Sequence, residues 1–417
     1  MFDLLVRGGT VVDPAQGLHA KLDVAVSEGK IAKIEASIPA TDANQVVDAT
    51  GNYVTPGLID IHAHIFRGDN HRDPDEVSGV FAGVTTALNA GGVSSSNIEE
   101  YQEVTLSQAK TKVYTNLGLL TGGSIHGHGL GLDVEGAVRT ALAYPDLVKG
   151  FKIHLMPNLV MQFGLRHIEA ARQAARSTGN FVLMHTGDLG PRNLPATPPE
   201  VTSQALDMLD EGDIVDHVFG PLTGGVVDQN MQVLPALRAA KERGVYLNTA
   251  VGDYQFGWAQ ADALLAQGPP VDFIASDIEI HSGNPNVGEV MVADGRTTGA
   301  RVAFGQTLVE YMASFLKLGF SLDEVIRMAT AAPAKAMGIE DTAGSLKVGL
   351  PADIVVLELL EGHFKLTDAT GVSRVGNLAL VPVVTLKAGT ICPVSSGTHD
   401  WGFAPPRATA EEVAALA

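Results

Sequence analysis

The sequence predicts an α/β fold in which eight parallel strands close into a barrel, accompanied by a small β domain. Two observations carry this prediction. Apolar, β-branched runs alternate with segments of helical spacing, and this unit recurs about every 30 residues, the length of one β-α unit. Both chain ends show instead short alternating strands separated by turns that contain Gly, such as Gly8-Gly9 and Glu28-Gly29.

Eight regular units of this kind indicate a TIM barrel. The predicted barrel strands are Leu58–His64, Val84–Ala90, Val113–Leu120, Val148–Leu155, Phe181–His185, Ile214–Phe219, Val245–Thr249 and Val271–Asp277. Helical spacing is found in Ile98–Lys110, Arg166–Arg176, Val201–Glu211, Met231–Arg243 and Ala259–Gln267. A doubly wound open sheet is the alternative, but such a sheet does not normally use eight regular units.

The two chain ends predict one small β-sandwich domain, which the barrel divides in the sequence. Neither end has enough strands for an independent sheet, so we expect them to join in space. We assign residues 1–55 and 345–400 to this domain, 56–344 to the barrel, and 401–417 to a tail that carries a short exposed helix over Ala408–Ala417. The expected strands are Leu4–Val12, Asp23–Val26, Ile31–Ala36, Asp353–Leu359 and Val383–Cys392.

Composition limits the classes of partner and compartment. The chain has 417 residues, of which 45% are hydrophobic, and a formal net charge of −19. This charge argues against nucleic acid or an anionic membrane surface as the main partner, because both require clustered Lys and Arg. The single cysteine, Cys392, excludes an internal disulfide framework and a Cys-based zinc module, and it indicates a reducing, cytoplasmic setting. We find neither a signal peptide nor an apolar run of about 18 residues.

Two histidines stand at the end of the first predicted barrel strand. Side chains alternate across a strand, so His62 and His64 share one face, which points into the barrel. The carboxyl end of a barrel strand is also where catalytic residues gather. Two imidazoles in this position can bind one metal ion, and the alternative is a pair of core histidines with hydrogen-bond partners.

A lysine lies within the fourth predicted strand. Burying Lys152 as a cation in an apolar run is costly. Reaction with carbon dioxide would convert it to a carbamate, an anion with two oxygens that can each bind one metal. The alternative is a lysine that extends its ammonium group to the barrel mouth.

Three more candidate ligands stand where apolar strands meet their loops. His185, His217 and Asp277 end the fifth, sixth and eighth predicted strands. Imidazole and carboxylate groups are ligands that zinc accepts. Because the carboxyl ends of all barrel strands meet at one rim, the sequence predicts a metal site there.

The complete set resembles the ligand pattern of the amidohydrolase superfamily. It consists of His62, His64, Lys152, His185, His217 and Asp277, in this order on strands one, four, five, six and eight. Residues 331–338, Gly344 and residues 349–355 also resemble the C-terminal signature of that superfamily. The resemblance covers nearly the whole chain. It is strongest to the dihydroorotase-like branch and, within it, to the amidohydrolase/deacetylase metallohydrolases.

The resemblance implies a binuclear site with two divalent metal ions, usually zinc. By analogy, His62, His64 and Asp277 would hold the first ion, and His185 and His217 the second. Carboxylated Lys152 and a hydroxide would bridge both ions. The hydroxide would attack a substrate carbonyl polarised by one metal, while Asp277 accepts its proton and passes it to the leaving group.

The resemblance is less specific for the substrate. Dihydroorotase proper has a His-x-His-x-Arg motif, whereas here Arg67 stands one residue further from His64. The turn after strand two, residues 88–92, also differs from the Met-Pro-Asn-Thr type. We therefore expect removal of an acetyl group from a small carboxylate-bearing substrate, such as an O-acetyl α-hydroxy acid or an N-acetyl amino acid. The alternative reactions are those of a cyclic amidase of the dihydroorotase or hydantoinase type and of a deaminase. A non-catalytic relative of these enzymes is a further alternative, but such a protein should lack some of the metal ligands, and all six are present here.

Several residues near the rim are candidates for substrate contacts. Arg67, His71 and Arg72 follow strand one and could meet the substrate carboxylate, unless they form only a solvated loop. His154 shares the inward face of Lys152 and could contact substrate or order the metal ligands. Three histidines in later loops are weaker candidates: His281, just past Asp277, and His126 and His128 in a Gly-rich segment that is either a lid or an ordinary loop. Related enzymes often form homo-oligomers, but no residue pattern here marks an interface.

Overall fold

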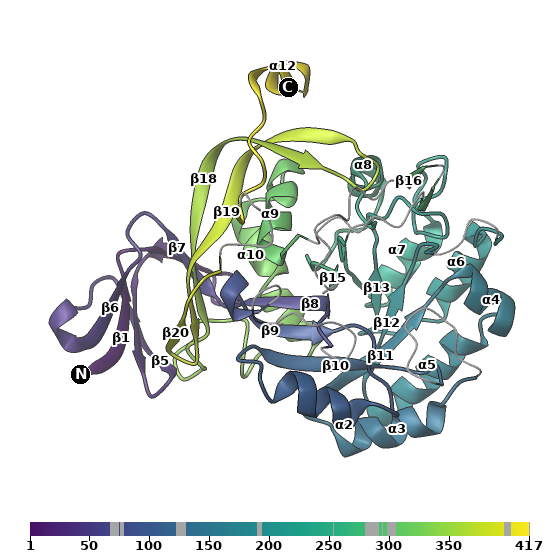
Figure 1. The fold of residues 1–417 in the computed structure, drawn as a ribbon, viewed down its shortest axis with the longest axis horizontal. Helices are drawn as coiled ribbons and strands as arrows, with labels where there is room; N and C mark the ends of the chain where they lie inside the picture. The colour runs from purple at the N-terminus through teal and green to yellow at the C-terminus, as the bar shows by residue number, and fades with distance from the viewer. Residues whose placement is uncertain are drawn as a thin grey trace.

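The computed structural model describes residues 1–66, 75, 79–121, 131–189, 194–252, 254–279, 292–293, 295–297, 306–395 and 402–416. A parallel sheet curls on itself at the centre, and helices cover its outside (Figure 1). Strands that follow one another in the chain lie side by side in the order β14-β13-β12-β11-β10-β9-β8-β15. Their bounds are β8 Leu58–His64, β9 Val84–Asn89, β10 Lys112–Gly118, β11 Val148–His154, β12 Phe181–His185, β13 Ile214–Asp216, β14 Tyr246–Leu247 and β15 Ile278–Glu279.

Backbone hydrogen bonds beyond the short strands close the curled sheet. Val251 N donates to Ala275 O at 2.9 Å and Gly252 N donates to Ser276 O at 2.8 Å, which joins the seventh and eighth predicted runs. Ile278 then pairs with Ala63 on β8. The parallel, curled α/β sheet expected from the alternating runs is therefore confirmed.

Helices follow most of the barrel strands, and local sequence signals set their ends. α6 and α7 begin at Pro199 and Pro235, where proline is well tolerated, and α5 ends at Gly179 in the left-handed conformation (φ 74°). The predicted helix Ile98–Lys110 is instead a short α2 followed by the π-helical η3. The bounds are η2 Val80–Ala82, α2 Ile98–Tyr101, η3 Gln102–Leu106, α3 Val134–Ala143, α4 Pro157–Phe163, α5 Arg166–Thr178, α6 Pro199–Asp207, α7 Pro235–Glu242, α8 Trp258–Gln267, α9 Leu308–Lys317, α10 Leu322–Met328, α11 Ala331–Ala336 and α12 Ala410–Leu416.

Both chain ends build the β structure beside the barrel (Figure 1). One sheet has the order β5-β4-β1-β6, and the other has the order β20-β19-β18-β7-β2-β3, so strands from both ends share the second sheet. The two sheets contribute to one apolar cluster that includes Val24, Val54 and Ile354. A discrete sandwich domain with the boundaries given above stays a prediction. The bounds are β1 Phe2–Arg7, β2 Thr10–Asp13, β3 Leu18–Lys21, β4 Asp23–Ser27, β5 Lys30–Glu35, η1 Ala40–Asp42, β6 Ala43–Asp48, β7 Tyr53–Pro56, β18 Ile354–Thr367, β19 Ser373–Lys387 and β20 Thr390–Cys392, and a separate small hairpin is formed by β16 Val292–Ala293 and β17 Arg296–Thr297.

Two of the predicted single strands are wrong because turns interrupt them. The run Leu4–Val12 breaks at Gly8, whose φ of 79° lies in the left-handed region that favours glycine. β1 and β2 therefore enter different sheets. The run Val383–Cys392 breaks in the same way at Ala388 and Gly389, with φ values of 45° and 77°.

The hairpin of β18 and β19 is much longer than the sequence predicted. It passes over α9 and reaches α8 with its tip (Figure 1). At the tip, Asp368 Oδ2 accepts a hydrogen bond from Trp258 N at 2.8 Å, and Ala369 N donates to Phe256 O at 2.9 Å. Arg374 on β19 lies over the Trp258 ring at 4.7 Å. The hairpin thus ties the start of α8 to the β structure of the chain ends.

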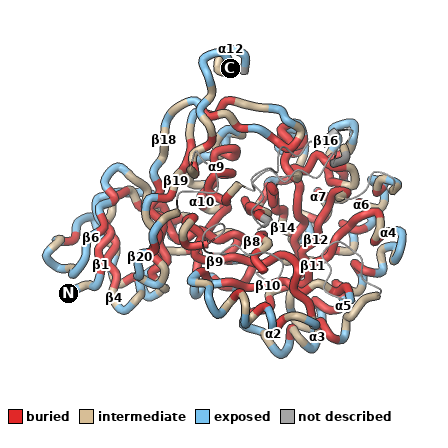
Figure 2. Tube along the Cα trace, viewed as in Figure 1, coloured by how far each residue is buried: buried red, intermediate tan, exposed pale blue. Residues whose placement is uncertain are grey.

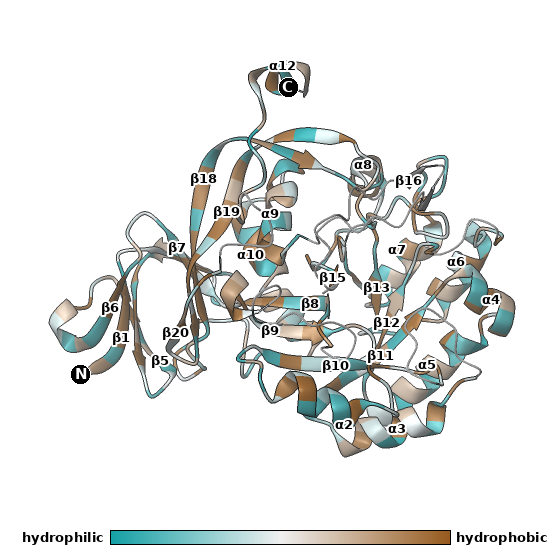
Figure 3. Ribbon diagram, in the orientation of Figure 1, coloured by the Kyte–Doolittle hydropathy of each residue, from teal (hydrophilic) through white to brown (hydrophobic). Residues whose placement is uncertain are grey.

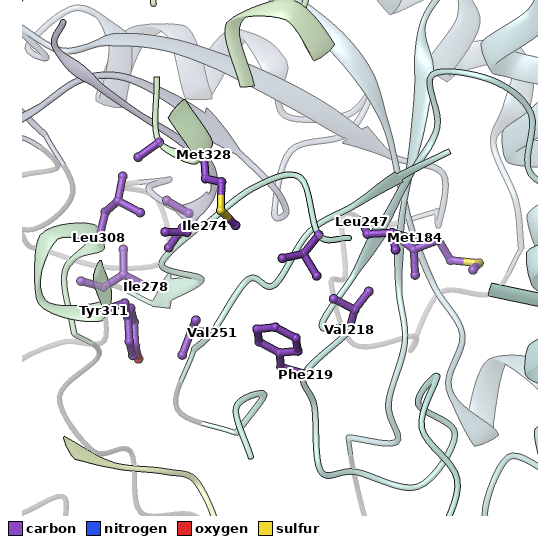
Figure 4. Close-up of a cluster of buried hydrophobic side chains, with 14 of the residues drawn as sticks. Met184, Val218, Phe219, Leu247, Val251, Ile274, Ile278, Leu308, Tyr311 and Met328 are labelled. Atoms are coloured by element: carbon purple, nitrogen blue, oxygen red, sulfur yellow. The ribbon is translucent and has the colours of Figure 1, made fainter. Parts of the chain in front are cut away.

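The strands of the curled sheet are mostly buried (red in Figure 2), and their apolar side chains divide between two clusters. Brown, hydrophobic stretches follow the strands in Figure 3, while teal residues gather on the outer helix faces. Figure 4 shows the outer layer near β12 and β14, where Met184 and Leu247 lie with Phe219 in one cluster. Inside the barrel, Ile59, Phe181 and Phe273 pack with Ala334 of α11. Among the described residues, no helix has the length and apolar character needed to span a bilayer.

Candidate metal centre

The predicted ligands lie on or next to five barrel strands. β8 carries His62 and His64, β11 carries Lys152, and His185 is the last residue of β12. The remaining two residues, His217 and Asp277, directly follow β13 and directly precede β15. The imidazole rings gather closely, with centroid separations of 5.3 Å for His62 and His217 and 4.4 Å for His185 and His217.

Two of these residues have an unusual backbone conformation. His217 has a φ of 66° and Asp277 a φ of 50°, in the left-handed region that non-glycine residues seldom adopt. Hydrogen bonds hold both, from Gly220 N to His217 O and from Asp277 N to His62 O, each at 2.8 Å. Strain of this kind clusters at functional sites, where surrounding structure compensates for it. Here it accompanies the approach of the two side chains to within 3.9 Å, between His217 Nδ1 and Asp277 Oδ2.

His62, His64 and Asp277 form the first group of ligand atoms. Asp277 Oδ1 lies 3.0 Å from His62 Nε2 and 3.2 Å from His64 Nε2. Two imidazole nitrogens and a carboxylate oxygen therefore face one another around a single position, and the three residues can hold a metal ion together.

His185 and His217 form the second group, and carbonyl groups set their tautomers. His185 Nε2 lies 2.9 Å from Gly187 O, and His217 Nδ1 lies 2.7 Å from Ala250 O. A carbonyl oxygen only accepts, so these nitrogens carry the hydrogen and the opposite nitrogens keep a lone pair. The buried Nε2 of His217 has no hydrogen-bond partner within the described part of the chain. An orienting carbonyl of this kind is typical of metal-binding histidines.

Lys152 lies between the two groups and is 3% exposed. Its Nζ donates to Asp216 Oδ2 at 2.9 Å. Asp216 is fully buried, also lies 3.0 Å from His62 Nδ1, and accepts a hydrogen bond from Asn248 Nδ2 at 2.8 Å. A buried lysine thus meets a buried carboxylate directly beside the histidines.

Burial and neighbouring charges set the protonation of the site. Burial lowers the pKa of His217 to about 4 and, with His217 and Lys152 nearby, lowers the pKa of His185 well below its usual value, so both rings are neutral at pH 7. For His62, burial and Lys152 lower the pKa, but Asp216 and Asp277 outweigh them and raise it to about 9. Burial raises the pKa of Asp277, but His62 and His64 outweigh it and hold the pKa well below its usual value.

The donor set fits a divalent metal site. Neutral imidazoles with free lone pairs, together with an ionised carboxylate, are the groups that zinc and similar ions accept. The unpartnered Nε2 of His217 is costly to bury unless a ligand occupies that position. The residues present are therefore consistent with a metal site, although the individual ligand assignments stay predictions.

A pocket opens beside Lys152 and encloses about 370 Å³, part of it open to solvent. His154, the last residue of β11, contributes to its wall, and the ring of His154 lies 5.0 Å from that of His185. His154 O accepts a hydrogen bond from His167 Nε2 at 3.1 Å, which fixes the end of the strand. The other residues of the pocket wall are small or apolar, apart from Ser94: Gly91, Gly92, Val93, Gly118, Leu119, Leu120, Ile153 and Leu159.

Several sequence candidates lie outside the described residues. They are Arg67, His71, Arg72, His126, His128 and His281. Their proposed contacts with substrate stay predictions.

Sequence reasoning missed Asp216 and Asn248. Asp216 directly precedes His217 in an apolar run, and this position was a signal that a second ionisable group would be buried at the rim. Asn248 ends the seventh predicted strand, but nothing in its local sequence indicates that its amide meets Asp216.

Comparisons with known proteins find similar proteins over nearly the whole chain. Residues 45–109 and 259–392 each match a model described as "Amidohydrolase family". A deacetylase of Enterococcus faecalis is 27% identical over 398 residues, which cover 94% of this chain and 99% of the relative. A dihydroorotase of Pelotomaculum thermopropionicum is 27% identical over 403 residues, covering 85% and 88% of the two chains.

Solved structures share the fold over nearly the whole chain. The crystal structure of an adenine deaminase has a TM-score of 0.79 and 26% identity, and the match covers 94% of this chain and 100% of that one. A dihydroorotase crystal structure matches with a TM-score of 0.76 at 21% identity, covering 94% and 98% of the two chains.

Proposed function

Since the chain belongs to the amidohydrolase superfamily, we propose that it removes an acetyl group from a small substrate that bears a carboxylate. Candidate substrates are O-acetyl α-hydroxy acids and N-acetyl amino acids. The observation that carries the proposal is the meeting of His62, His64 and Asp277 around one position, beside the neutral pair His185 and His217. The similarity to a deacetylase over 99% of that protein's length supports the acetyl group.

Two divalent ions, zinc in the simplest case, would occupy this site. His62, His64 and Asp277 would hold one ion, His185 and His217 the other, and carboxylated Lys152 would contribute one oxygen to each. When bound, such ions polarise a carbonyl group and lower the pKa of water toward neutrality. Oxygen and nitrogen ligands in this combination suit zinc.

Asp277 is the residue of this chain that would move a proton. Its pKa lies well below the usual value, so the carboxylate is ionised at neutral pH and can accept a proton at Oδ1 or Oδ2. Its backbone N–H donates to His62 O at 2.8 Å, which fixes the residue against the first strand. From this position Asp277 would return the proton to the leaving group.

The pocket beside Lys152 suits a short acyl chain. Glycines at positions 91, 92 and 118 and the apolar side chains around them leave a small space without charged groups other than Lys152. The His154 ring at the wall would contact the substrate. We propose Arg67, His71 and Arg72 as the groups that meet the substrate carboxylate.

Ring opening of a cyclic amide and deamination are the second candidates. The dihydroorotase is as similar in sequence as the deacetylase, at 27%, and the adenine deaminase shares the fold at 26% identity. All three reactions would use the same ligands, so the products must distinguish them.

The test is a metal-loaded assay against N-acetyl amino acids, O-acetyl hydroxy acids and cyclic imides, with acetate, ammonia and ring opening read separately. We expect acetate release, and we expect Asp277→Asn to lose about 10²–10⁴-fold in rate. The matched control is Asp146→Asn, because Asp146 is exposed in the loop that precedes β11, away from the rim. Full activity of Asp277→Asn, or release of ammonia alone, would refute the proposal.

A further inference from the structure

The buried carboxylate of Asp216 is not one of the six predicted ligands, although its oxygen also lies close enough to nitrogens of His62 and His217 for these three residues to hold a metal ion. We propose that Asp216 is a positioning residue, which orients the carboxylated Lys152 side chain and His62 for metal binding. The inference rests on the carboxylation of Lys152 proposed above.

Three contacts fix the Asp216 carboxylate. Oδ1 accepts a hydrogen bond from Asn248 Nδ2 at 2.8 Å. Oδ2 accepts from Lys152 Nζ at 2.9 Å and lies 3.0 Å from His62 Nδ1. The Asp216 side chain is fully buried and that of Lys152 is 2% exposed, so water does not compete for either. Because each oxygen has its own neighbour, the carboxylate cannot rotate without losing a contact.

The contact with Lys152 is one that carboxylation preserves. The ammonium first releases one proton to solvent, and the nitrogen lone pair then bonds to the carbon of carbon dioxide. One C=O π pair moves onto oxygen, and a second proton leaves the nitrogen for solvent. The product still carries one N–H, which can donate to Asp216 Oδ2 as the amine does now. With this N–H held by Asp216, rotation about the bond between Cε and the nitrogen is restricted, which limits the directions in which the two new oxygens can lie.

The contact of Asp216 with His62 would also orient a side chain for metal binding, here the imidazole ring. In the neutral ring that would bind a metal, a carboxylate 3.0 Å from Nδ1 favours the tautomer with its hydrogen there, which leaves the lone pair on Nε2. Nε2 is the atom that lies 3.0 Å from Asp277 Oδ1, on the ligand side of the ring. Asp216 Oδ2 would therefore orient two groups. One is His62, a proposed ligand of the first ion, and the other is the carboxylated Lys152 that both ions would share.

Asn248 does not face the predicted ligands directly. It is linked to them by its hydrogen bond to Asp216. Among the described residues, its side chain meets Asp216 only, through Nδ2, while its backbone pairs with Val215 and Phe273. A change at Asn248 would therefore reach Lys152 and His62 through Asp216.

The experiment measures metal content and the carbamate in Asp216→Asn, without substrate. The protein is loaded with zinc in buffer that contains ¹³C-bicarbonate, and the carbamate is read by ¹³C NMR. We expect metal binding about 10–100-fold weaker than in the unaltered protein, in line with other residues that orient metal ligands, together with a reduced carbamate signal. Asn248→Ala should show the same loss to a smaller degree. Asn180→Ala is the matched control, because Asn180 makes a similar amide contact, with Val148 O at 3.1 Å, at the far end of the same strands.

A second arm separates positioning from plain support of the fold. In Lys152→Ala protein rescued with a short carboxylic acid, there is no N–H for Asp216 to hold. Adding Asp216→Asn should then weaken metal binding several-fold less than it does in the Lys152 protein. An equal loss in both backgrounds would overturn the inference, as would full metal and carbamate in either Asp216→Asn or, should that variant not fold, Asn248→Ala. Failure to release acetate would refute the proposed function alone, because these readouts involve no substrate.

Discussion

Gly252 lies directly against the carboxylate of Asp277, and a single added methyl group should disturb the site. Its φ is 50°, and a Cβ built there would lie 2.5 Å from Asp277 Oδ2 and 3.1 Å from Asp277 Cγ. An ordinary contact between carbon and oxygen is about 3.3 Å or longer, so the carboxylate would have to retreat by roughly 0.8 Å. The glycine itself is held by hydrogen bonds from Gly252 N to Ser276 O and from the Tyr311 hydroxyl to Gly252 O.

A displacement of this size is large for a reacting centre. A misplacement of about 1 Å can cost about 10²-fold in rate, and the retreat would also stretch the contacts of Asp277 with His62 and His64. We therefore expect Gly252→Ala to lose about 10²-fold in kcat/KM and to bind metal more weakly. The strained backbone should add about 1 kcal/mol of lost folding stability.

The control isolates backbone strain from contact with the site. Gly179 has a φ of 74° and nothing within 4 Å of its Cβ position. Gly179→Ala should lose about the same stability and keep its activity and metal content. If both variants unfold at similar temperatures and Gly252→Ala works within about threefold of Gly179→Ala, the reasoning about Asp277 is wrong.

Three further predictions concern protonation, the hairpin and the metals. Burial raises the pKa of Glu310 to about 8, so its stabilising contribution is present at low pH and is lost as pH rises through about 8. We measure thermal unfolding of the unaltered protein and of Glu310→Gln at pH 6 and pH 9. Between these two pH values the stability of Glu310→Gln relative to the unaltered protein should rise by up to about 2.7 kcal/mol, whereas a constant difference would contradict this. Asp368→Ala removes the hydrogen bond to Trp258 N and should cost about 1–3 kcal/mol in urea unfolding, with faster proteolysis at the hairpin tip; unchanged cleavage would argue against docking. Zinc uptake at pH 7 should release at least the proton held by His62, whose pKa is about 9, measured by calorimetry in buffers of different ionisation enthalpy; no dependence on the buffer would contradict this.

The barrel strands and the gathering of the candidate ligands at one rim were predictable because both depend on short segments. The run that ends at His62 and His64 is apolar and alternates, so both the strand and the shared face of the histidines follow from local sequence. His185 and Lys152 sit in similar runs. The rim follows from topology, since parallel strands present their carboxyl ends together.

The features that the sequence did not predict depend on contacts between distant segments. The left-handed backbone of His217 and Asp277 has no local signal, because neither residue is glycine. Asp216 meets Lys152 across 64 positions of chain. The long hairpin was missed because residues beyond Leu359 alternate irregularly, and contacts with α8 and α9 decide their conformation. Propensity is a weak guide wherever such contacts compete with it.

Charge balance explains why metal binding and the proposed carboxylation of Lys152 would depend on each other. Without bound cations, the Lys152 ammonium and the protonated His62 face two buried carboxylates, Asp216 and Asp277, so the positive and negative charges cancel. Unpaired buried charge costs several kcal/mol for each ion, so two divalent cations cannot simply be added to this arrangement. Loss of the His62 proton and the proposed conversion of Lys152 to a carbamate would exchange two cations for one further anion, and three anions would then face the metals. Removing the metals should therefore also destabilise the carbamate, because three buried anions would then remain without a counter-ion.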